Sequence, residues 1–239
     1  MAQQAGAEQM TDTYVQALAL GLDPTWRRLP DEEREASSDE FARAVAADGD
    51  DGVRTYTYST IGLQSGSDVL LWRLAESVDA LEEAGARTLR SGLGRWLFVR
   101  ESFIGVLKPT QYVTTPTEQE QSAFGGERSR YLVVYPFTKS SEWYLLGREA
   151  RQGIMNEHMK VGRQWPAIRQ LLAYSFGMDD NDFLVAYEMD DLPSFGDLVR
   201  ALRGTESRRS TVRDTPILTA IHRPMDEILR LLGAPEGAS

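Results

Sequence analysis

The chain has 239 residues, no cysteine and two histidines, and its 36 acidic side chains against 26 basic ones give a net charge of −10. Without cysteine there can be no disulfide framework, no thiolate metal site and no cysteine nucleophile. The acidity argues against a nucleic-acid surface and against a polybasic membrane anchor, both of which need clustered positive charge. Its apolar runs fall well short of the roughly 18–20 residues of a membrane span, and the first residues lack a secretory signal pattern. We therefore expect a soluble, cytoplasmic protein.

The apolar pattern of the first half alternates between the strand and helix periods. A helix is expected to start within residues 29–33, because Pro30 and the acidic residues after it suit a first turn, and to end near residue 47. A second helix is expected at 77–91. Strands are expected at residues 14–20, 53–61, 68–74 and 97–107.

The second half repeats this order after a segment, 108–130, that is rich in Pro, Thr, Glu, Gln, Gly and Ser. This composition predicts a linker or mobile loop. Helices are then expected at 146–162 and 192–203, and strands at 131–137, 169–176, 182–189 and 215–221.

Each half therefore has the order β-α-β-β-α-β, which is the ferredoxin-like unit. We predict an α+β fold in which two such repeats pack through their sheets with the helices outside. The expected boundaries are 11–107 for the N-terminal repeat, 108–130 for the linker and 131–222 for the C-terminal repeat. Residue repetition between the halves is weak, so the prediction rests on element order.

His158 is the main candidate for chemistry. It shares one helix face with Ile154 and Val161, and that face is apolar. One interpretation is a core histidine hydrogen-bonded to a neighbour, and the other is a metal ligand or general base that reaches into a cavity. A single histidine in a cysteine-free chain can hold haem iron. His222 follows the last strand and is expected to be exposed.

Several segments resemble the chlorite dismutase and coproheme decarboxylase superfamily. They are Tyr135–Lys139 (YPFTK), Glu142–Tyr144 (EWY), Glu157–His158, Gly177–Phe183 (GMDDNDF) and Glu188–Leu192 (EMDDL), with weaker matches at 23–30, 94–96 and 105–112. The resemblance implies two ferredoxin-like repeats forming a dimeric α+β barrel. It also implies a homo-oligomeric ring, commonly a pentamer, and a haem b or iron-coproporphyrin III in the C-terminal repeat.

The resemblance also assigns roles on the proximal side of the porphyrin. His158 resembles the iron ligand, and Glu206 the acceptor for its other ring nitrogen. Lys139 resembles a residue near a propionate and that glutamate, and Trp143 one packed along the porphyrin. Without the resemblance, Glu206 and Lys139 would be interpreted as surface charges and Trp143 as ordinary core.

The distal side separates the activities of the superfamily. Chlorite dismutases carry an arginine on the strand after the haem helix, and the matching position here is Gln170, with Arg169 one residue away. A slip of one residue on a strand turns a side chain to the other face, so only one of the two can face the pocket. Tyr135 resembles the redox-active tyrosine of one group of coproheme decarboxylases, although it is also compatible with a plain sheet residue.

The function that these residues imply is a haem-dependent oxidoreductase, with peroxide-dependent decarboxylation of iron-coproporphyrin III to haem b as the expected reaction. His158 would hold the iron, Tyr135 would relay a hydrogen atom and Gln170 would assist on the distal side. The alternatives are chlorite dismutation to chloride and O2, which would require Arg169 in the pocket, and a haem-binding protein without turnover.

Overall fold

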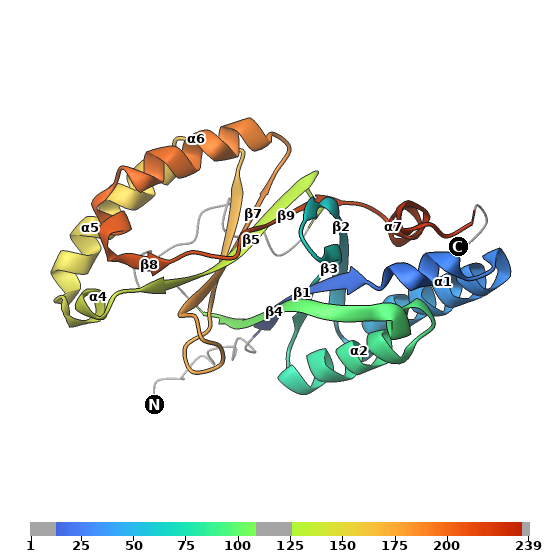
Figure 1. Cartoon of the computed structure of the whole chain (residues 1–239). Helices are drawn as coiled ribbons and strands as arrows, with labels where there is room; N and C mark the ends of the chain where they lie inside the picture. The colour runs from blue at the N-terminus through green and yellow to red at the C-terminus, as the bar shows by residue number, and fades with distance from the viewer. Residues whose placement is uncertain (1–12, 109–125, 236–239) are drawn as a thin grey trace, which may run out of the picture.

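The computed structural model describes residues 13–108 and 126–235 (Figure 1). The first half contains β1 (Thr13–Leu22), α1 (Asp31–Ala46), β2 (Arg54–Gln64), β3 (Ser67–Ala75), α2 (Val78–Arg90) and β4 (Leu97–Leu107). Short 3-10 turns lie between them at η1 (Pro24–Arg28), η2 (Ala47–Asp51) and η3 (Leu93–Trp96). Every strand and helix predicted for this half is present.

The second half contains β5 (Tyr131–Lys139), α4 (Ser141–Leu145), α5 (Arg148–Gly162), β6 (Arg169–Tyr174), β7 (Phe183–Met189) and α6 (Leu192–Arg203). It ends with η5 (Glu206–Ser210), β8 (Thr211–Arg213), β9 (Leu218–His222) and α7 (Met225–Leu232). The prediction missed α4, β8 and α7, and it began the last strand three residues too early. Most of the predicted linker, 109–125, lies outside the described residues.

The strands of the described chain form one nine-stranded sheet in the order β7-β6-β4-β1-β3-β2-β9-β5-β8. An additional pairing between β5 and β7 joins the two ends of this order and closes the sheet, while β8 extends β5 on one side. Neighbouring strands are antiparallel throughout the registers of β1–β9. The result is the predicted α+β barrel built from two similar halves.

The barrel interior is an apolar core to which both halves contribute. It contains Val15, Ala17, Ala19, Tyr58, Leu70, Trp72, Leu74, Phe103, Leu132, Val134, Leu171, Ala173, Leu184, Ala186, Leu218 and Ala220. Because side chains alternate along a strand, the other face of each sheet points outward and packs on helices. Outside the barrel, α1 and α2 cover the first half together with α7 from the end of the chain, and α5 and α6 arch over β5 and β7 (Figure 1). No helix among the described residues is long and apolar enough to cross a membrane.

Candidate haem site

His158 lies on α5 and is largely buried, and its Nδ1 is a buried atom with no hydrogen-bond partner among the described residues. Burial, with a smaller contribution from the ammonium of Lys139, lowers the pKa of His158 to about 4, although Glu157 opposes the shift. The imidazole is therefore neutral at pH 7, which is the form that binds a metal. A core histidine would normally have a partner for each buried nitrogen, so the interpretation as a hydrogen-bonded core residue does not describe this one.

The packing of α5 leaves room for a bound group. None of its 15 residues is fully buried, whereas α1, the corresponding helix of the first half, buries Ser38, Phe41, Ala44 and Val45. The contacts of α5 are mainly with α6 and η5 rather than with the sheet beneath. Its apolar residues Ile154, Met155, Met159 and Val161 are only half-buried. A flat apolar molecule held between α5 and the sheet would complete this burial, so the residues present fit a porphyrin.

Lys139 and Trp143, the two further candidates for the proximal side, come together at the end of β5. The Lys139 side chain is buried, and Nζ donates hydrogen bonds of 3.1 Å to Ser207 O, Ser207 Oγ and Thr211 Oγ1. Nζ also lies 4.7 Å from the ring centroid of the buried Trp143. Burial, with a smaller contribution from Arg208, lowers the pKa of Lys139 to about 8. The charge of Lys139 contributes to the lowered pKa of His158, so the pair Lys139 and Trp143 lies within electrostatic range of the histidine.

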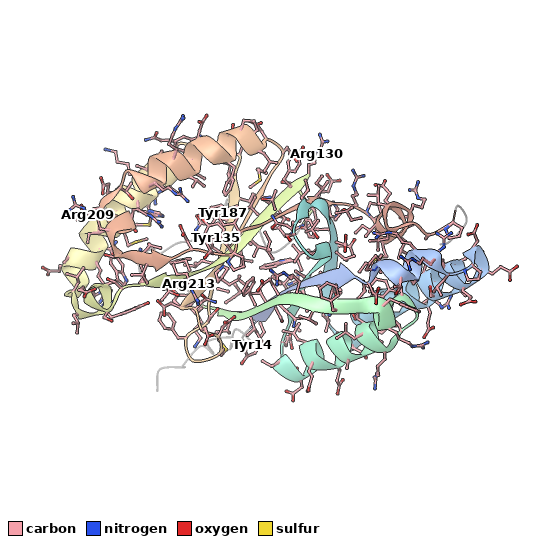
Figure 2. All side chains as sticks on the ribbon, in the orientation of Figure 1. Tyr14, Arg130, Tyr135, Tyr187, Arg209 and Arg213 are labelled. Atoms are coloured by element: carbon pink, nitrogen blue, oxygen red, sulfur yellow. The ribbon has the colours of Figure 1, made fainter. Side chains whose placement is uncertain are left out.

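Glu206 lies beside α5 but its carboxylate does not contact His158. The backbone N–H of Glu206 donates to Glu157 Oε2 at 3.0 Å, which ties η5 to α5. Its own carboxylate is 3.2 Å from Nη1 of Arg209, an exposed residue of η5 (Figure 2). The expected acceptor is thus close in the fold, while the predicted hydrogen bond to the ligand histidine is not formed.

Tyr135 and Tyr187 lie side by side on the face of the sheet that α6 covers (Figure 2). Their rings stack at 6.1 Å between centroids, and burial raises the pKa of both phenols, so each keeps its proton at neutral pH. Tyr135 also borders a hollow of about 200 Å³. The other residues around this hollow are Phe195, Gly196, Val199, Arg203, Asp214 and Ile217.

The register of β6 and β7 decides which distal candidate faces this layer. Gln170 pairs with Tyr187 and Arg169 pairs with Glu188, so Gln170 shares the face of Tyr187 and Arg169 lies on the opposite face. There Arg169 Nη2 is 2.8 Å from Glu188 Oε2 and also donates to Glu127 O and Ser129 Oγ. The neutral side chain of Gln170 therefore faces the candidate site, and the guanidinium of Arg169 is held on the other face of the sheet.

Three residues at this site were not predicted from the sequence. Tyr187 was treated only as part of a strand, although its spacing of two from Val185 and Met189 places all three on one face. Arg203 and Asp214 meet Tyr135 at the hollow from α6 and from the segment after β8. A lone charge at the end of a helix gives no sequence signal that separates it from an ordinary solvated residue. His222 ends β9, and its ring packs half-buried on Tyr58 at 5.3 Å rather than being fully exposed.

Comparison with known proteins agrees with this geometry. The sequence profile of the family described as chlorite dismutase matches residues 13–223. A coproheme decarboxylase of Mycolicibacterium smegmatis is 30% identical over 205 residues, which cover 84% of this chain and 87% of that protein. The structure of the chlorite dismutase of Candidatus Nitrospira defluvii in complex with imidazole has a TM-score of 0.84 and 28% identity, covering 92% of this chain and 94% of that one. A mutant of the same enzyme has a TM-score of 0.85 and 29% identity, covering 93% and 96%.

The family profile and the coproheme decarboxylase relative, together with the barrel fold, identify the chain as a member of the class of haem-dependent oxidoreductases, as the sequence predicted. Since the family profile covers most of its length, the chain belongs to the chlorite dismutase family.

Proposed function

We propose that this chain catalyses the peroxide-dependent oxidative decarboxylation of iron-coproporphyrin III to haem b. The observation that carries the proposal is the arrangement of the two faces of the C-terminal sheet. Tyr135 and Gln170 share the face beneath α5 and α6, whereas Arg169 is bound to Glu188 on the other face. The relative from M. smegmatis, named as a coproheme decarboxylase, supports the same choice of substrate.

In this proposal the porphyrin lies between α5 and the sheet, and His158 binds its iron. The iron of the bound porphyrin would react with peroxide. The protein residues would bind and orient the porphyrin and transfer hydrogen. Trp143 would pack along the porphyrin, with Lys139 beside it. Glu206 would leave Arg209 and accept a hydrogen bond from Nδ1 of His158, which lacks a partner in the described structure.

The proposed reaction converts each of two propionates into a vinyl group. One propionate, one hydrogen peroxide and one proton give one vinyl group, one CO2 and two waters, so the side chain is oxidised and peroxide is reduced. A C–H bond and the bond to the carboxyl carbon break. Tyr135 would relay the hydrogen atom, because burial keeps its phenol protonated. Arg203, at the same hollow, supplies a cation for a propionate carboxylate, and Gln170 would assist peroxide without adding charge.

The chlorite dismutase reaction is the alternative within the family. It would require a cation at the distal position, where this chain has Gln170. Arg169 would have to break its ion pair with the buried Glu188 and cross the sheet. We therefore favour the decarboxylase. We also propose, from the family resemblance, that residues 131–222 form the haem-binding repeat and that the protein works in the cytoplasm as a homo-oligomer, with a pentamer favoured.

The experiment that tests the proposal compares two tyrosine variants on β5. The protein is loaded with iron-coproporphyrin III, peroxide is added stepwise, and the porphyrin is analysed by mass spectrometry. We expect the wild type and Tyr131→Phe to remove two carboxyl groups and Tyr135→Phe to remove none. Tyr131 is a matched control because it lies on the same face of the same strand. Equal turnover by Tyr135→Phe would contradict the role given to Tyr135.

A further inference from the structure

The acidic hairpin between β6 and β7, residues 175–182, has a role that the proposed reaction does not use. Its last residue, Asp182, places a single carboxylate oxygen between two other elements. Oδ2 accepts a hydrogen bond of 2.7 Å from the backbone N–H of Lys139 and one of 2.6 Å from the hydroxyl of Tyr144. The backbone oxygen of Asp182 closes the hairpin by accepting from Ser175 N at 2.8 Å.

The backbone of Lys139 is available to Asp182 because the β5 ladder is interrupted there. The pairing of β5 with β7 ends at Phe137 and Phe183, and the pairing with β8 shifts register between Thr138 and Lys139. Such irregularities re-aim side chains next to functional sites. Here the Lys139 N–H is satisfied by a side chain of the hairpin, while Nζ points to Ser207, Thr211 and Trp143.

The same carboxylate is also hydrogen-bonded to α4, through Tyr144. This helix has only five residues and one buried side chain, Trp143, so it has little packing of its own. The hydroxyl of Tyr144 binds Asp182, and its ring meets Phe176 of the hairpin edge-on at 5.8 Å. Tyr144 and Trp143 are neighbours in sequence, and fixing the first therefore fixes the second.

We propose that Asp182 is a positioning residue of the haem site, which holds the pair Lys139 and Trp143 beside His158. It acts through the Lys139 backbone and the Tyr144 hydroxyl and does not touch the porphyrin. The inference rests on the proposed function for the identity of the site. The position of Lys139 can be measured in the protein without porphyrin, so the two ideas fail separately.

The first measurement uses the three lysines of the chain, Lys108, Lys139 and Lys160. The porphyrin-free protein is treated with an amine-acylating reagent, and the labelling of Lys139 is measured by mass spectrometry relative to the exposed Lys160. We expect Asp182→Ala to raise the relative labelling of Lys139 about tenfold. The variant removes the carboxylate that accepts from the Lys139 N–H, and this loss frees the end of β5. Asp182→Asn keeps an acceptor oxygen and should restore most of the protection.

Asp180→Ala is the matched control, since Asp180 is an exposed residue of the same hairpin and should leave labelling unchanged. If Asp182→Ala does not fold, Tyr144→Phe, which removes one of the two hydrogen bonds, should give a smaller rise and carries the test. In the haem-loaded ferrous protein, resonance Raman should show a shifted Fe–His stretch for Asp182→Ala and the wild-type frequency for Asp180→Ala. Wild-type labelling and stretch in Asp182→Ala would overturn the proposal, whether or not the wild type decarboxylates coproporphyrin.

Discussion

At the scale of single residues, His158 makes the stability of the candidate haem site depend on pH. The unfolded chain binds a proton at its ordinary pKa of 6.5, whereas the folded protein takes it up only near pH 4. Between these values the unfolded state binds more protons, so the free energy of unfolding falls as the pH falls. Above pH 6.5 the histidine is neutral in both states, and it does not change the free energy of unfolding with pH.

This difference predicts the behaviour of the porphyrin-free protein in acid. From pH 7 to pH 4 the wild type should lose roughly 2 kcal/mol more stability than His158→Leu, a figure reduced from the full shift because the ring is partly exposed. Urea unfolding at a series of pH values measures the effect. The same loss in both proteins would show that His158 is not the group whose buried neutral imidazole makes the stability depend on pH.

A second residue-scale prediction concerns Gln170 and Arg169. Because Gln170 faces Tyr187 and Arg169 faces Glu188, Gln170→Arg should place a cation in the pocket. Chlorite-driven release of O2 from the haem-loaded protein should then rise at least about tenfold. Arg169→Gln is the paired variant and should leave chlorite activity at the wild-type level. An O2 electrode gives the answer, and a loss of chlorite activity in Arg169→Gln alone would place Arg169 in the pocket after all.

At the scale of elements, buried charge fixes η2 against the first sheet. Asp48 binds the fully buried Arg73 at 2.9 Å and Arg87 at 2.7 Å, and accepts a hydrogen bond from Thr55. Removing one member of such a group leaves charge uncompensated inside the protein. Asp48→Ala should therefore lower the free energy of unfolding by about 3–5 kcal/mol. Asp50→Asn, on the exposed side of η2, should change it by less than about 0.5 kcal/mol.

Chemical denaturation of the two variants tests this comparison. Equal stability of Asp48→Ala and Asp50→Asn would mean that η2 is held by its apolar neighbours instead of by the charge cluster.

The elements also show how far the sequence could predict the fold. The helices and strands with a clear apolar period were found to within a few residues, and 97–107 and 192–203 match β4 and α6 in full. β8 has three residues, too few for a period, and its order comes from pairing with β5. α7 was missed although it carried signals: Pro224 before it, Asp226 and Glu227 in its first turn, and Gly233 after it.

For the site, the sequence names candidate residues but not their contacts. His158 was named from its helix face and Lys139 and Trp143 from family motifs, and the contact of Lys139 with Trp143 appears only in the fold. The choice between Gln170 and Arg169 needed the register of β6, because one residue of uncertainty inverts the face. The pairing of Glu206 with Arg209 depends on side-chain positions within η5, which no motif specifies.

At the scale of the whole molecule, the two halves meet where β4 approaches β6, and a glycine permits the approach. A Cβ on Gly105 would lie 2.9 Å from Cβ of Ala173 and 3.0 Å from Oγ of Ser175. Gly105→Ala should therefore push the strands apart and destabilise the barrel by about 1–3 kcal/mol. Gly153→Ala, on the open face of α5, should instead stabilise it by up to about 1 kcal/mol. Thermal unfolding of the two variants measures these changes in stability. A Gly105→Ala protein as stable as the wild type would mean that β4 and β6 are loosely packed at this point.

The most direct test of the whole account is the mass of the porphyrin recovered after peroxide is added to the protein loaded with equimolar iron-coproporphyrin III, measured for the wild type and for His158→Ala. The account predicts that the wild type binds the porphyrin and returns it without two of its carboxyl groups, passing through a product that lacks one, and that His158→Ala returns it intact. A wild type that binds the porphyrin, leaves all its carboxyl groups in place and releases O2 from chlorite would contradict the proposed function.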